Sequence, residues 1–137
     1  MKIKALSGAA GVLLLACAPV AVANAADTSN YQTQSGKVLC AVTPNSSLVG
    51  LGPDAVVCQG EFSVAPTNYN SAVTTGNGSF RWEQGNIAVD DPTTFMTYGS
   101  TYHRGGWTIY HDSSGTRFTL DKTGHGMFVS IDDVHPF

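Results

Sequence analysis

Apolar and polar residues alternate at every second position over three segments of the C-terminal half, residues 106–112, 116–121 and 127–132. A period of two places successive side chains on opposite faces of an extended strand. The groups DSSG at 112–115 and KTGHG at 122–126 separate these segments and favour tight turns. The pattern predicts an antiparallel meander of three strands with one apolar face.

Further strands are predicted upstream, where turn-forming groups again interrupt short apolar runs. Residues 71–91 divide into two or three strands at GNG (76–78) and QGN (84–86). Two more strands, at about 37–42 and 55–62, each carry one cysteine. Leu, Ala, Glu and Lys do not gather at helical spacing in these regions. Seven or eight strands predict an all-β fold, either a small antiparallel sandwich or a partly closed barrel.

The connection between the two cysteine strands, TPNSSLVGLGPD at 43–54, is longer than a tight hairpin needs. It places Leu48, Val49 and Leu51 where solvent would be expected. Two interpretations remain open: a loop that folds back over one end of the core, or an exposed apolar tip that contacts a partner.

The first residues have the layout of a secretory leader. Lys2 and Lys4 precede a short apolar stretch, and the small-x-small triplet that ends at Ala25 follows it. The stretch is shorter than the roughly 20 residues of a membrane-spanning helix. We therefore expect cleavage near Ala25 and a protein that is secreted or held in the cell envelope. Lipidation at Cys17, which follows LLA, is the alternative.

This leader divides the chain into a signal peptide at 1–25, a flexible segment at 26–36 and one β domain at 37–137. Cleavage leaves five of the seven basic residues against ten acidic ones. Such an acidic balance argues against nucleic acid and anionic lipid as partners, because both require a basic surface. We expect a monomer without a membrane span.

Cys40 and Cys58 are the two cysteines that remain after cleavage, and we expect them to form a disulfide. An exported protein meets oxidising conditions in which paired cysteines join. A zinc site would need four ligands, and no second Cys or His pair stands at a suitable spacing. A redox dithiol usually has the C-x-x-C spacing, whereas 17 residues separate these two.

Motifs for catalysis are weak. The chain has no G-x-S-x-G elbow, H-E-x-x-H pair or phosphate-binding glycine loop. His111, Asp112 and the serines that follow suggest a triad, but neighbouring strand residues point to opposite faces, so a turn is the better interpretation. A metal site built from His103, His111 and a carboxylate stays open as an alternative.

Residues 91–106, DPTTFMTYGSTYHRGG, combine aromatic, small and charged side chains as recognition surfaces do. We expect any binding surface here, with Phe95, Tyr98, Tyr102 and Arg104 as its members. The opposing interpretation is a loop whose aromatic rings fold back onto the sheet. Trp82 and Trp107 are predicted to be core residues.

The segments YQTQSGKVLC at 31–40 and VVCQGEF at 56–62 resemble small exported proteins of mycobacteria and related actinobacteria. Many of these carry an S-G-x-x-x-C segment followed by V-x-C and an aromatic-rich β region. The resemblance implies an exported, disulfide-bonded β domain and adds no mechanism.

Together these observations predict a non-enzymatic binding or interaction protein that needs no cofactor. Its partner would be an unidentified protein or a cell-envelope ligand. The alternatives are a structural envelope protein, or a hydrolase or metal-dependent enzyme with a site near His103 and His111.

Overall fold

The computed structural model describes residues 29–43, 54–87 and 92–137. These residues form eleven strands and no helix. The strands are β1 (Ser29–Gln32), β2 (Val38–Thr43), β3 (Ala55–Gly60), β4 (Ser71–Thr75), β5 (Phe80–Glu83), β6 (Thr93–Phe95), β7 (Ser100–Arg104), β8 (Trp107–Asp112), β9 (Gly115–Leu120), β10 (Gly126–Val129) and β11 (Val134–Pro136). The described residues thus include no helix long and apolar enough to cross a bilayer.

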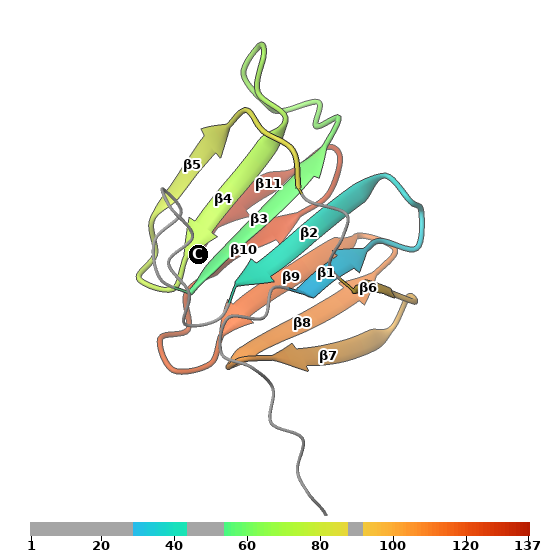
Figure 1. Cartoon of the computed structure of the whole chain (residues 1–137), viewed down its shortest axis with the longest axis vertical. Coiled ribbons are helices and arrows are strands. Elements are labelled where there is room, and N and C mark those ends of the chain that lie inside the picture. Colours follow the sequence, from blue (N-terminus) through green and yellow to red (C-terminus); the bar gives the residue numbers. More distant parts are fainter. Residues whose placement is uncertain (1–28, 44–53, 88–91) are drawn as a thin grey trace, which may run out of the picture.

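The strands build two sheets that lie one over the other (Figure 1). One has six strands in the order β5-β4-β3-β2-β1-β6, and the other has five in the order β11-β10-β9-β8-β7. Every neighbouring pair is antiparallel except β1 and β6, which are parallel. The all-β sandwich is therefore confirmed, and its sheets do not close into a barrel.

The five-stranded sheet is the predicted meander with one strand added at each edge. Strands β8, β9 and β10 follow one another in sequence and in space. The inward positions of β8 are buried and alternate with more exposed ones, as a period of two requires. The edge strand β11 has three residues and ends on Pro136, which an edge tolerates because one side has no ladder to complete.

Four strands were not predicted, and this is why the structure has eleven instead of seven or eight. They are β1, β6, β7 and β11. Strand β1 lies within the segment expected to be flexible, 26–36, yet it pairs with β2 on one side and β6 on the other. Its Tyr31 is buried in the core. Of these, β1 and β6 pair with each other although they lie far apart in the sequence, a contact that local composition does not encode. Strands β7 and β11 instead pair with the strands next to them in the chain, β8 and β10, through short turns.

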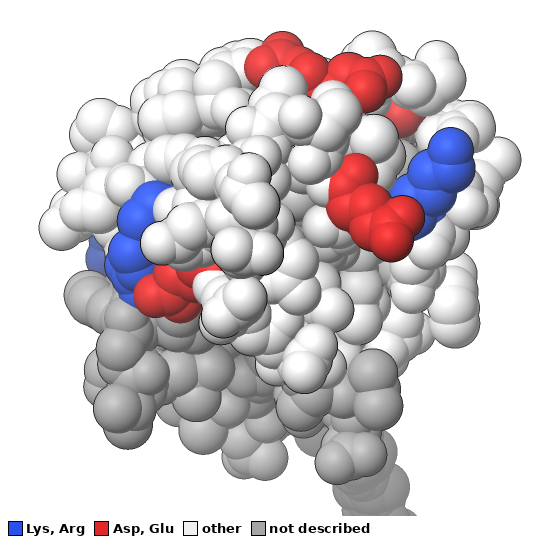
Figure 2. Space-filling view, turned by 90° about the horizontal axis from the view of Figure 1, so that it is seen from above, with Lys and Arg blue, Asp and Glu red and all other residues white. Residues whose placement is uncertain are grey.

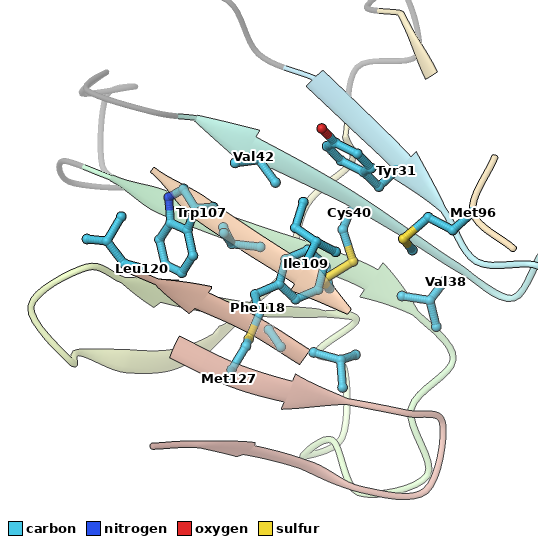
Figure 3. Close-up of a cluster of buried hydrophobic side chains, with 14 of the residues drawn as sticks. Tyr31, Val38, Cys40, Val42, Met96, Trp107, Ile109, Phe118, Leu120 and Met127 are labelled. Carbon is cyan, nitrogen blue, oxygen red and sulfur yellow. A yellow bond between two sulfur atoms is a disulfide. The ribbon is translucent and has the colours of Figure 1, made fainter. Parts of the chain in front are cut away.

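Large apolar side chains from both sheets fill the space between them (Figure 3). The five-stranded sheet contributes the largest, and Trp107 is fully buried as predicted. Trp82 is only partly buried and packs against Phe62 and Phe80. The buried cluster is Tyr31, Val38, Cys40, Val42, Val56, Cys58, Phe62, Ala72, Met96, Trp107, Ile109, Phe118, Leu120, Met127 and Val129.

The predicted disulfide is present between Cys40 and Cys58. The two residues are direct register partners on β2 and β3, and their Cα atoms are 4.0 Å apart. Both are fully buried, so the cystine is part of the apolar layer. The leader, Cys17 and residues 44–53 of the long connection lie outside the described residues.

Removing the disulfide will destabilise the domain by about 3 kcal/mol, because the unfolded chain regains the freedom of the loop between residues 40 and 58. Urea unfolding of the oxidised protein, with and without reductant, measures this loss. The Cys40→Ala/Cys58→Ala double variant is the control, and reductant should leave its midpoint unchanged. Two free thiols in the unreduced protein would contradict the prediction.

Gly126 begins β10 and lies directly against β9. A Cβ atom there would lie 1.7 Å from the carbonyl oxygen of Phe118, so no side chain fits without separating the strands. Gly126→Ala should therefore cost about 3 kcal/mol or more of unfolding free energy. Gly85→Ala is the matched control, because its Cβ would meet open space. Equal midpoints for the two variants in urea would refute this account.

Candidate binding site

The structure separates the four predicted binding residues into two groups. The first group, Phe95 and Tyr98, is exposed. The exposed fraction of the Phe95 side chain is 73 %, and that of Tyr98 is 45 %. Phe95 ends β6, and Tyr98 lies in the turn that leads to β7. Between them, Met96 is buried in the core and its backbone N–H donates to the carbonyl of Gln32 at 2.8 Å. This segment is therefore attached to β1 while it presents two aromatic rings to solvent.

Tyr102 and Arg104 belong to β7 and are half-buried. The Tyr102 ring packs against the core, with its centroid 6.1 Å from that of Tyr31. The backbone N–H of Thr97 donates to the Tyr102 hydroxyl at 2.9 Å. Hydrogen bonds from Thr97, first from its side chain and then from its backbone, lower the pKa of Tyr102 below 10.0. Burial raises the pKa of Tyr31, and the positive charge of Arg104 acts in the opposite direction and lowers it. These two residues are partly structural.

His103 and His111 lie on opposite faces of the five-stranded sheet. His111 occupies an inward position of β8 and is buried, whereas His103 is exposed on β7 opposite Thr108. Within the described residues, no group of three His, Cys, Asp or Glu side chains could hold a metal ion. The geometry therefore does not assemble the metal site that the sequence left open.

Asp112 and the serines after it form a turn, as expected. Asp112 and Gly115 are the last register pair of β8 and β9. One carboxylate oxygen of Asp112, Oδ1, accepts hydrogen bonds from the Ser114 backbone N–H at 2.8 Å and from its hydroxyl at 2.5 Å. The hydroxyl and then the backbone bond of Ser114 lower the pKa of Asp112 below 3.8. Asp112 is ionised at neutral pH and orders the hairpin tip.

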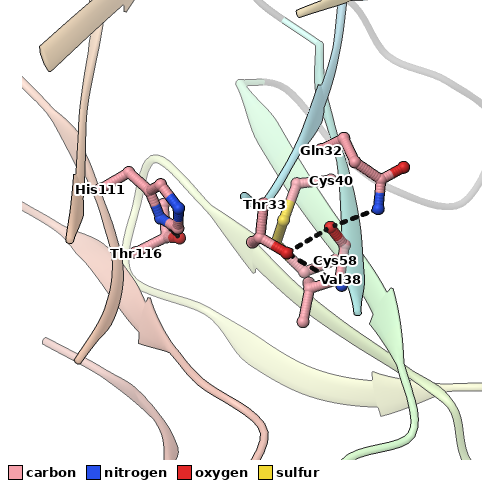
Figure 4. Close-up of a disulfide and its surroundings, with 7 residues drawn as sticks. All are labelled: Gln32, Thr33, Val38, Cys40, Cys58, His111 and Thr116. Carbon is pink, nitrogen blue, oxygen red and sulfur yellow. Dashed lines mark hydrogen bonds between the residues drawn. A yellow bond between two sulfur atoms is a disulfide. The ribbon is translucent and has the colours of Figure 1, made fainter. Parts of the chain in front are cut away.

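Both ring nitrogens of His111 are engaged. The backbone N–H of Gln34 donates to Nε2 at 3.2 Å, so this nitrogen must be unprotonated. The proton of the neutral ring is then on Nδ1, which donates to the hydroxyl of Thr116 at 2.9 Å. Figure 4 shows His111 and Thr116 on one sheet, across from Thr33 and the disulfide on the other. His111 therefore connects the two sheets at one end of the sandwich.

Burial keeps His111 neutral, because desolvation lowers its pKa below the ordinary value of 6.5. The charge of Asp112 and a backbone hydrogen bond with Gly115 act in the opposite direction and are weaker. A second proton would also displace the N–H of Gln34 from Nε2. An imidazole with no free lone pair cannot act as a general base in this arrangement.

The turn between β1 and β2 positions Gln34 against both His111 and Tyr98. Thr33 closes this turn, because its hydroxyl accepts from the Val38 backbone N–H at 3.2 Å (Figure 4). Its backbone N–H also donates to the Val38 carbonyl at 3.0 Å. The side-chain oxygen of Gln34 accepts from the Tyr98 backbone N–H at 2.7 Å. The Tyr98 ring lies against His111, with centroids 5.1 Å apart. Tyr98 is therefore held at its backbone by Gln34 and at its ring by His111.

A polar cleft of about 260 Å³ opens beside this cluster, and we call it the end cleft. Its walls come from the β1–β2 turn, the turn at Tyr98, the β8–β9 hairpin and the chain that leaves β10. Its lining residues are Thr33, Ser35, Lys37, Val38, Tyr98, His111, Asp112, Ser113, Ser114, Gly115, Thr116, Val129, Ser130, Ile131 and Asp132. Segments distant in sequence thus meet at one end of the sandwich.

Several polar groups of the end cleft have bonding capacity left over. Lys37 is exposed and makes no ion pair with any described residue. The Tyr98 hydroxyl has no hydrogen-bond partner among those residues. Asp132 accepts from the Ser63 hydroxyl at 3.0 Å through one oxygen, as Asp112 accepts from Ser114 through one oxygen. Each carboxylate therefore has a second oxygen available to a ligand.

A second, larger concavity of about 930 Å³ crosses the outer face of the six-stranded sheet, and we call it the sheet groove. Cys40 and Cys58 point into the core, so their neighbours Leu39 and Gln59 point outward. Gln32 is the register partner of both Leu39 and Phe95, which places Phe95 on this same face. The groove is lined by Gln32, Gly36, Lys37, Leu39, Gln59, Gly60, Glu61, Asn70, Asn86, Ile87 and Ile131.

Two side-chain amides of the sheet groove already form hydrogen bonds within the protein. Gln59 accepts from the Ile87 backbone N–H at 2.8 Å, and Asn70 exchanges hydrogen bonds with the backbone of Gly85 at 2.9 and 3.1 Å. These bonds fasten the segment after β5 to the sheet. The end cleft is the smaller concavity, but its polar groups are freer, so it is the stronger candidate for a ligand.

Sequence reasoning found Tyr98 but missed most of the end cleft. Gln34 lies in the segment expected to be flexible, and Lys37 follows it directly. Ser130 and Asp132 lie near the C-terminus. The turn residues Ser35 and Gly36 signal a bend, and Gly36 adopts a φ of 76°. No local signal indicates that this bend faces the β8–β9 hairpin. Comparison with protein-family models, curated proteins and solved structures found no match to this chain.

The stability of the domain should fall as the pH is lowered through 6.5, because the unfolded chain takes up a proton at His111 that the folded state resists. The His111 contribution is complete above 6.5 and disappears as the pH approaches the lower folded pKa. Urea unfolding between about pH 8 and pH 5 measures the slope. His111→Gln should flatten it, and His103→Gln, at an exposed position, should not. A wild-type slope of opposite sign would contradict this assignment.

Proposed function

We propose that the chain is an exported, non-enzymatic binding domain that acts at the cell envelope or outside the cell. The observation that carries this proposal is the end cleft, in which Lys37, the Tyr98 ring and two carboxylates retain bonding capacity. Turns between paired strands carry these groups; Gln34 holds the backbone of Tyr98, and His111 supports its ring. Preorganised polar groups around an exposed aromatic ring are typical of recognition sites.

Two features support export. The disulfide is buried and joins paired strands, which suits a protein that folds under oxidising conditions. The chain also begins with a basic, apolar and small-residue sequence of the kind that directs secretion. The resemblance to exported actinobacterial proteins agrees with this location.

A binding role is favoured over catalysis because the end cleft pairs no hydroxyl with an effective base. His111 has both nitrogens in hydrogen bonds, and the hydroxyl of Ser114 donates to Asp112. A serine nucleophile would need a neighbouring group that accepts its proton. The acidic carboxyl of Asp112 is a poor acceptor at neutral pH because its pKa is lowered.

The charge pattern supports a partner other than nucleic acid. The chain has ten acidic and seven basic residues. On the face shown in Figure 2, charged side chains are few, the basic ones lie beside acidic ones, and no basic patch is seen. Nucleic-acid binding requires a basic footprint for the phosphates. An uncharged or mixed ligand suits this surface better.

Tyr98→Ala should weaken binding of the purified protein to an envelope fraction of the source organism by about tenfold or more, because it removes the ring from the end cleft. The matched control is Tyr110→Ala, whose side chain is 42 % exposed on the outer face of β8. Sedimentation with the fraction measures binding. Urea unfolding should show a loss of about 1 kcal/mol or less for both variants. Equal binding of wild type and Tyr98→Ala would reject the end cleft as the site.

A further inference from the structure

We infer that the end cleft binds one unit of a neutral saccharide, with the Tyr98 ring as the platform for the sugar. This inference rests on the proposed binding function and specifies its ligand class. It follows from the size of the cleft, its charges and the position of the ring.

The size of the end cleft selects a small ligand. Its volume of about 260 Å³ lies just below the range of about 300–1,000 Å³ for pockets that enclose drug-sized molecules. A folded peptide or a lipid chain would not fit. One sugar ring fits, and the open cleft allows neighbouring units of a chain to continue into solvent.

The charges of the end cleft disfavour anions and bare metal ions. Phosphate and other anions are disfavoured because Asp112 and Asp132 accompany the single ammonium of Lys37. A bare metal ion is disfavoured because no cluster of three possible ligands exists among the described residues. A neutral ligand with many hydroxyl groups avoids both penalties.

Sugar hydroxyls match the groups that line the end cleft. A carboxylate accepts hydrogen bonds from hydroxyls, and an ammonium donates to their oxygens. The free oxygens of Asp112 and Asp132 and the Lys37 ammonium supply these two roles. Charge-assisted hydrogen bonds of this kind are stronger than neutral ones. The hydroxyls of Ser113 and Tyr98 add groups that both donate and accept.

The Tyr98 ring suits the C–H face of a sugar. Aromatic rings carry negative charge on their faces, which attracts the weakly positive C–H groups of a pyranose or furanose. The ring is 45 % exposed, so one part is open to the ligand while His111 supports another. Its backbone is held by Gln34, so little conformational entropy is lost on binding.

An NMR titration of the isotope-labelled protein with glucose, galactose, mannose, arabinose and N-acetylglucosamine tests the inference. We expect at least one sugar to produce saturable shifts in the backbone amides of Ser113, Ser114 and Gly115. Tyr98→Ala should weaken this binding by about tenfold, while Tyr98→Phe retains most of it and Tyr110→Ala all of it. Absence of such shifts with all five sugars would overturn the inference.

Treating the envelope fraction before sedimentation separates this inference from the proposed function. Periodate destroys vicinal diols and should abolish the Tyr98-dependent binding, whereas proteinase treatment should leave it intact. Binding that survives periodate and is lost after proteinase would overturn the saccharide ligand and keep the binding function. Wild-type protein that does not bind the envelope fraction, even untreated, yet still binds a sugar in the titration, would overturn the envelope role and keep the saccharide site.

Discussion

The buried layer between the two sheets, with the Cys40–Cys58 cystine inside it, is the constraint on which the structure depends. A small domain buries a limited share of its surface, so its apolar layer is small. Each sheet has one apolar face that the other sheet covers, and the cystine belongs to the same cluster as Trp107 and Phe118. The covalent bond also holds β2 against β3 in the middle of the six-stranded sheet. Together, the packing and the crosslink provide the stability that a larger core would supply alone.

The end cleft depends on this layer because its walls come from both sheets. The β1–β2 turn belongs to the six-stranded sheet, and the β8–β9 hairpin belongs to the five-stranded one. His111 joins them through Gln34 on one side and Thr116 on the other. A change in the spacing of the sheets would break this bridge and move the Tyr98 ring. The histidine thus has a structural role, and it positions the Tyr98 ring at the end cleft.

Of the candidate site, the aromatic component was predictable and the polar component was not. Tyr98 stands in a segment whose mix of Gly, Thr and aromatics indicates recognition, and the exposed Phe95 belongs to the same segment. Tyr102 shares this composition but packs onto the core, because its position on β7 points inward. Composition is the same for a ring on either face of a strand. The pairing of β7 with β8 places the Tyr102 ring on the inward face, and the pairing of β6 with β1 places Phe95 on the outer one.

The sequence by itself determined the strand class, the disulfide and the inward faces of the meander. The strands and their inward faces follow from the local period and the turn residues, which are properties of short segments. The disulfide was expected from two cysteines in a chain predicted to be exported. The tertiary structure alone decided the strands β1 and β6, the burial of Tyr31 and the meeting of Gln34, His111 and Tyr98. In each case the stabilising partner lies far away along the chain. Such contacts form because the two sheets must cover one another, and no local pattern specifies which turns then become neighbours.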